Sequence, residues 1–166
     1  MSRKLVKRVI RHVSDQLETG ERVLEVAKVL PHGGGATETA ANVGGAIGSG
    51  LGRWLEKKQA EETPEAKGTE LDQSGDASRW PPLQRALLTL TDRRLVLFDV
   101  KGINDKPGTI RADFDLDRID GMSAKARRNV YELRVSFADG SVITIETARL
   151  ALPGPLIEAF ERAAGT

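Results

Sequence analysis

The sequence contains no cysteine and only two histidines. Without thiols the chain can form no disulfide, no thiolate nucleophile and no thiolate metal site, so its fold depends on packing alone. This composition fits the reducing cytoplasm. His12 lies in a basic segment and His32 in a glycine-rich one, so neither belongs to a cluster of catalytic side chains. We therefore expect a protein that is not an enzyme and holds no metal or cofactor.

An excess of one charge and a long apolar run are also missing. Lys and Arg number 25 against 24 Asp and Glu, so no overall field attracts nucleic acid. Any charged partner would have to be recognised by a local patch. Basic residues interrupt the apolar ones at the N-terminus, unlike in a secretory signal, and the weakly polar stretch 40–55 is too short and glycine-rich to span a membrane. We expect a cytoplasmic protein, associated with the inner membrane face at most peripherally.

Three aspartates resemble the start of a calcium loop but do not complete it. Asp113, Asp115 and Asp117 alternate along one strand face. A calcium loop needs glycine at its sixth position and glutamate at its twelfth, where this chain has Arg118 and Ala124. The aspartates are more typical of a solvated strand face that pairs with neighbouring arginines and discourages edge pairing.

The N-terminal segment 1–17 is predicted to form an amphipathic basic helix. Its apolar residues recur at three- and four-residue spacing, which places them on one helical stripe. Because so many basic residues suit a buried element poorly, we expect a peripheral helix whose stripe lies on a membrane or partner and whose removal leaves the remainder folded. The stripe consists of Leu5, Val6, Val9, Ile10, Val13 and Leu17, and the basic residues are Arg3, Lys4, Lys7, Arg8 and Arg11.

Alternating apolar and polar residues predict about seven strands. Residues 21–30 alternate and end at a proline, although a helix is an alternative there. From residue 80 onward the pattern is consistently that of strands, and Asp139-Gly140 is typical of a hairpin turn. Proline and glycine then open an amphipathic helix. The predicted later elements are strands at 87–90, 95–100, 110–116, 119–125, 131–137 and 141–147, and a helix at 153–164.

A glycine-rich segment, 33–58, separates the first predicted strand from the second. Its run GGAIGSGLG lacks the Gly-Lys-Ser/Thr ending of a phosphate loop. On a helix, its glycines would form a flat ridge beside a row of larger residues, suited to close contact with another helix or with a membrane. A glycine-rich loop is the alternative, because each helical glycine costs up to about 1 kcal/mol relative to alanine. The residues of this candidate contact are Val43, Gly44, Ile47, Gly48, Leu51, Gly52 and Trp54.

Four features follow one another in the chain: the stretch ALLTLTDRRLVLFDV, an Asp-rich strand ending in DLDRIDGM, an ADGS turn between two strands, and a closing helix. In this order they resemble the bacterial pleckstrin-homology-like and GRAM-like domains. The resemblance implies a mainly β domain over 21–164, in which two packed antiparallel sheets are capped by the C-terminal helix. The domain would consist of 21–30 and 80–164, interrupted by the glycine-rich segment and a polar, flexible linker at 59–79. That insertion replaces the loop that forms the lipid site in many such domains.

Two basic loops are the remaining candidates for a binding site. Arg93 and Arg94 fall in one predicted loop and Lys125, Arg127 and Arg128 in another. If the loops converge, they would hold an anionic lipid headgroup or an acidic peptide. Ordinary solvated loop charge is the alternative. We therefore expect a non-enzymatic recognition module that binds a membrane surface or a partner protein, with self-association through the glycine-rich helix, and without lipid, as the alternative.

Overall fold

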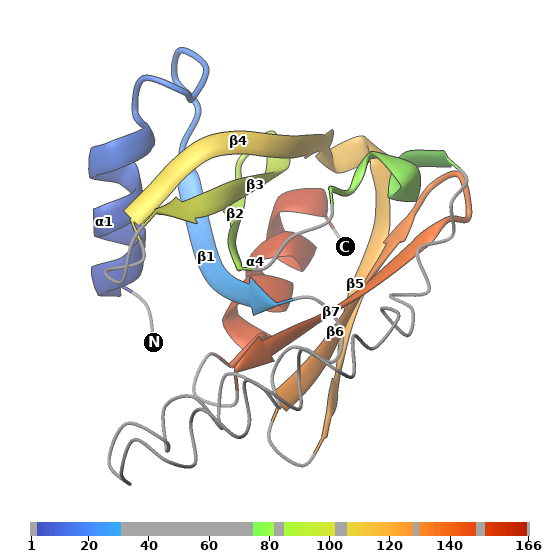
Figure 1. Ribbon diagram of the computed structural model, residues 1–166. Helices are drawn as coiled ribbons and strands as arrows, with labels where there is room; N and C mark the ends of the chain where they lie inside the picture. Colours follow the sequence, from blue (N-terminus) through green and yellow to red (C-terminus); the bar gives the residue numbers. More distant parts are fainter. Residues whose placement is uncertain are drawn as a thin grey trace, which may run out of the picture.

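The computed structural model (Figure 1) describes residues 3–30, 75–81, 85–101, 106–127, 130–148 and 152–165. These residues form seven strands, two α-helices and two short 3₁₀ helices. The expected mainly β fold with helices at both ends is confirmed, and residues 21–30 contain a strand, not a helix. The strands are β1 (Val23–Leu30), β2 (Ala86–Thr91), β3 (Arg94–Lys101), β4 (Lys106–Asp115), β5 (Ile119–Ala126), β6 (Val130–Phe137) and β7 (Val142–Ala148). The helices are α1 (Arg3–Val13) and α4 (Gly154–Ala164), with short 3₁₀ helices η1 (Gly75–Arg79) and η2 (Leu116–Arg118).

The strands form one antiparallel sheet in the order β4-β3-β2-β1-β7-β6-β5. β1 joins its two halves, pairing with β2 along most of its length but with β7 only at Val29↔Thr147 and Leu30↔Glu146. The halves β1–β4 and β5–β7 therefore turn toward each other, with α4 between them (Figure 1). This arrangement fits the description of a pleckstrin-homology-like β-sandwich.

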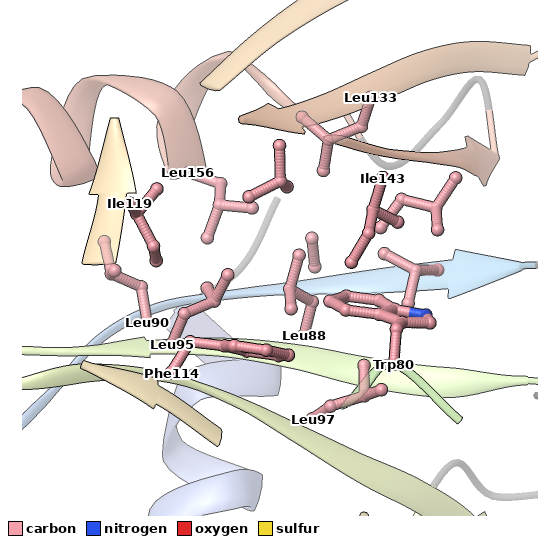
Figure 2. Close-up of a cluster of buried hydrophobic side chains, with 14 of the residues drawn as sticks. Trp80, Leu88, Leu90, Leu95, Leu97, Phe114, Ile119, Leu133, Ile143 and Leu156 are labelled. Carbon is pink, nitrogen blue, oxygen red and sulfur yellow. The ribbon is translucent and has the colours of Figure 1, made fainter. Parts of the chain in front are cut away.

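The main core lies between the two halves of the sheet and α4. Figure 2 shows Leu133 and Ile143 of the second half facing residues of β2 and β3. Trp80 stacks on Phe114, with ring centroids 5.9 Å apart. α4 contributes Leu156, Ala159 and Phe160, all buried, so the predicted apolar stripe of this helix closes the core. The burial of these side chains supplies most of the driving force for folding.

A second apolar cluster covers the opposite face of β1–β4. Leu5, Val9 and Val13 of α1 pack there, and Val9 and Val13 have no exposed surface. The expectation of a peripheral N-terminal helix is therefore wrong, because its stripe is an integral part of the domain. The helix also ends at Val13, short of the predicted residue 17. The sheet residues of this cluster are Val26, Leu87, Val96 and Phe98.

The end of the predicted linker is also ordered. Residues 75–79, assigned to the linker at 59–79, form η1 and bury Asp76 and Ala77. Gly75 adopts a φ of +60°, and a Cβ at this position would collide with the Asp139 carboxylate. Both the positive φ and the collision therefore exclude a side chain at residue 75. The prediction failed here because polar groups of η1 are buried through hydrogen bonds to residues far away in the sequence.

Candidate functional site

The outward face of α1 is strongly basic. The helix contains no acidic residue between Arg3 and Val13. Because its stripe of Leu5, Val9 and Val13 is buried against the sheet, the residues on the opposite side of the helix point away from the domain. Figure 1 shows α1 lying outside the β1–β4 half of the sheet. We call the exposed side chains Lys4, Lys7, Arg8 and Arg11 the α1 basic face.

The cations of the α1 basic face are largely uncompensated. Within the described chain, Lys4, Lys7 and Arg11 make no ion pair, while Arg8 does have an interaction partner. Ile10, beside them, is 43% exposed. β4, against which α1 packs, also carries exposed Lys106 and Arg111. The α1 basic face is therefore a cationic surface with one exposed apolar side chain, Ile10, at its border.

The turn after α1 anchors the helix to the rest of the domain. The Gln16 side chain donates a hydrogen bond to the Gly108 carbonyl (2.9 Å) and accepts one from the Ile110 amide (3.3 Å). Arg93 donates a hydrogen bond to the Glu18 carboxylate at 2.9 Å. These contacts, together with the buried stripe, hold the helix in one orientation, so the direction of the basic face is built into the fold.

Arg94 is committed to structural ion pairs. Its guanidinium donates two hydrogen bonds to the Glu21 carboxylate, both 2.9 Å, and one to Asp113 at 2.7 Å. Burial alone would raise the pKa of Glu21, but hydrogen bonds from Arg94 and from the Glu18 amide outweigh it and hold that pKa below its ordinary value. Two carboxylates therefore neutralise Arg94, and Arg93 pairs with Glu18.

The two predicted basic loops do not come together. Arg94 pairs with Asp115 at the end of β4, and η2 leads from there directly into β5. Lys125 and Arg127 lie at the other end of β5, so the whole strand separates them from the first loop (Figure 1). Arg127 also pairs with Glu132 at 2.7 Å. Arg128 and the glycine-rich contact at 43–54 lie outside the described residues.

Sequence reasoning missed a second polar cluster, which joins η1 to η2 and to the turn between β6 and β7. Asp76 accepts a hydrogen bond from Arg118 at 2.6 Å, and its amide donates to Asp139 at 2.6 Å. The Ser141 hydroxyl also donates to Asp139, and these hydrogen bonds lower the pKa of the Asp139 carboxyl. Because every charge has a partner, this cluster stabilises the fold and offers no open site. The Asp139-Gly140 turn signal was the only local hint of it.

No group of three or more His, Asp or Glu side chains in the described chain is arranged to hold a metal ion. The His12 ring bonds to the Arg8 carbonyl within its own helix. Neither of the helices described here is long and apolar enough to cross a membrane. The α1 basic face, with its exposed Lys4, Lys7 and Arg11, is the candidate binding surface.

No protein-family model matches this chain, and a search of curated proteins found no match either.

Proposed function

We propose that the protein is a non-enzymatic recognition module of the pleckstrin-homology-like type that docks on an anionic membrane surface through the α1 basic face. The observation that carries this proposal is the orientation of α1. Its apolar stripe is buried on the sheet, so Lys4, Lys7 and Arg11 are presented together and outward, and none of them has an ion-pair partner among the described residues. The fold alone would support lipid, peptide or protein recognition equally.

An anionic bilayer suits this surface in both charge and shape. Each Lys or Arg near such a surface contributes about 1 kcal/mol, and the attraction decays within a Debye length. Ile10, 43% exposed, is placed at the border to reach the region between headgroups and acyl chains. Because the anionic lipids of a cell line its cytoplasmic leaflet, the proposed location is the cytoplasm, at the inner face of the membrane.

The test is vesicle flotation with phosphatidylcholine alone and with phosphatidylcholine containing phosphatidylserine. We expect the wild type to float only with the anionic vesicles and to be released at high salt. Reversing two charges, Lys7→Glu with Arg11→Glu, should weaken binding at least about tenfold. The matched control is Arg134→Glu with Arg162→Glu, which changes the net charge equally on exposed sites of β6 and α4.

Three results would contradict the proposal. One is equal binding to neutral and anionic vesicles, and another is equal loss in the α1 variant and in the control. The third is failure of the wild type to bind any vesicle at low salt, which would favour an acidic protein surface as the partner instead.

A further inference from the structure

β5 is an open edge of the sheet. It ends the strand order and has β6 as its one sheet neighbour among the described strands. After an irregularity between Ile119 and Gly121, residues 121–126 pair regularly with β6. The side chains of 123–126 are all exposed. An exposed regular edge with small side chains is a template for pairing with another strand.

The hydrogen-bonding groups of this edge can be assigned from the hairpin. The Arg127 amide donates to the Val130 carbonyl at 2.9 Å, which makes these residues a hydrogen-bonded pair. Bonded and non-bonded pairs alternate along an antiparallel ladder. Backbone groups at 121, 123 and 125 therefore point to β6, whereas those of Met122, Ala124 and Ala126 point to the open edge.

The other edge strand, β4, is protected against such pairing. It contains Pro107, which has no amide to donate. Its register with β3 shifts twice, between Leu97 and Phe98 and again between Phe98 and Val100. Charged side chains also alternate along it. Proline, irregular register and charge are the devices by which sheets block edge pairing, so only one of the two edges is open.

The sequence of the β5 edge is complementary to itself. In an antiparallel pair centred on Ser123, the two serines face each other, Met122 lies opposite Ala124 of the second copy, and Gly121 lies opposite Lys125. The large side chain thus meets a small one. Asp120, next to the irregularity, comes beside Lys125 of the second copy, so opposite charges meet twice across the two-fold axis.

We propose that β5 pairs with β5 of a second copy of this chain, in antiparallel register centred on Ser123, to form a symmetric dimer with a continuous sheet. Met122 and Ala124 would exchange backbone hydrogen bonds with their counterparts on either side of the axis. Because the contact consists of a few such bonds, the dimer should form at high protein concentration and dissociate on dilution.

The first test is Ala124→Pro, read by sedimentation equilibrium from micromolar to near-millimolar protein. The Ala124 amide points to the open edge, so proline removes a donor for the second copy without breaking the ladder to β6. We expect the dissociation constant to rise at least about tenfold. The circular dichroism spectrum and melting temperature of the variant establish that the monomer is still folded.

The second test exchanges the paired charges. Asp120→Lys alone or Lys125→Asp alone places like charges together and should weaken the dimer about tenfold. The two changes combined restore opposite charges and should restore the dimer. Asp117→Lys, at an exposed acidic residue of η2, is the matched control and should leave the dissociation constant unchanged.

A wild type that stays monomeric at near-millimolar concentration overturns the proposal. So does a dimer that is insensitive to both Ala124→Pro and the charge reversals, because its contact must then lie elsewhere. A combined exchange that fails to rescue a dimer lost in both single reversals overturns the proposed register. None of these outcomes bears on vesicle binding through α1, so this inference and the proposed function can fail separately.

Discussion

Glu21 shows how a single buried charge is kept ionised in this fold. Its side chain is 0% exposed, and that of its partner Arg94 is 11% exposed. Removing such a pair from water is costly, and the cost is offset only where the geometry is good and the remaining lone pairs are satisfied. Here two hydrogen bonds from Arg94 and one from the Glu18 amide meet that condition. The pair therefore links the start of β1 to β3.

Replacing Glu21 with glutamine should leave the largely buried guanidinium of Arg94 with Asp113 as its remaining carboxylate partner, and that partner is itself partly exposed. We expect Glu21→Gln to lower the free energy of unfolding by about 3 kcal/mol, measured by denaturant titration near neutral pH. Glu18→Gln is the matched control, because the Arg93–Glu18 pair is about half exposed on both sides and should cost less than about 1 kcal/mol. Similar losses in the two variants would contradict this reading of Arg94.

The Arg94–Glu21 pair also makes the free energy of unfolding depend on pH in the acidic range. The folded-state pKa of Glu21 lies below the ordinary value of 4.5, which applies when the chain is unfolded. A lowered folded-state pKa gives a contribution that is fully present above the unfolded-state pKa and is lost as pH falls through the folded-state pKa. The difference between wild type and Glu21→Gln should therefore be constant near neutral pH and shrink below about pH 4. A difference that shrinks already at neutral pH would contradict this.

α1 is an element with two different faces, and each has its own task. The buried stripe holds the helix on the sheet, while the α1 basic face is directed outward. Stability and binding should therefore be separable by mutation. The earlier expectation that residues 1–17 can be removed without harm no longer holds, because removal would expose Leu87, Val96 and Phe98 on the sheet.

Val9→Ala tests the buried face directly. Val9 has no exposed surface, so losing two methyl groups should cost about 2 kcal/mol of unfolding free energy. Ile10→Ala, one residue away and 43% exposed, should cost much less. Thermal and denaturant unfolding of both variants measure this. Equal, small effects would mean that α1 does not pack as described.

Across the whole molecule, protection should follow the order of the sheet. β2 and β3 are internal strands with neighbours on both sides, whereas β5 has one neighbour among the strands that the structure describes. Native-state hydrogen exchange should therefore be slowest at amides such as Leu88 and Leu97 and fast at Met122 and Ala124 in dilute protein. Slower exchange at Met122 and Ala124 in concentrated protein would accompany the proposed dimer. Strong protection of both in dilute protein would contradict an open edge.

Local patterns were sufficient for most of the strands. Residues 131–137 alternate between apolar and polar side chains and are followed by Asp139-Gly140, so the hairpin of β6 and β7 was predictable from nearby residues alone. The C-terminal helix was predictable for the same reason, because its stripe and its opening proline lie within one segment. These elements need no information from distant parts of the chain.

The sequence also indicated that some element covers the outer face of β2 and β3, where α1 packs, but the prediction did not use this signal. All residues of β2, Ala86–Thr91, are buried, and Leu95, Val96, Leu97 and Phe98 of β3 are buried in succession. A continuous apolar run indicates a strand covered on both faces, so some element had to cover the second face. The Arg94 pairs gave no comparable signal, since Glu21 is 73 residues away in the sequence.

The position of β1 also determines when the core can be completed during synthesis. Among the described elements, β1 is synthesised before the other strands, yet its neighbour β7 is synthesised after them, and α4 after β7. The β2–β3–β4 meander can form early, but the face that it turns toward the main core stays uncovered until β7 and α4 have been synthesised. Nascent chains that stop before α4 should therefore remain aggregation-prone and need protection by chaperones, because the domain folds as one unit only when its last helix is available.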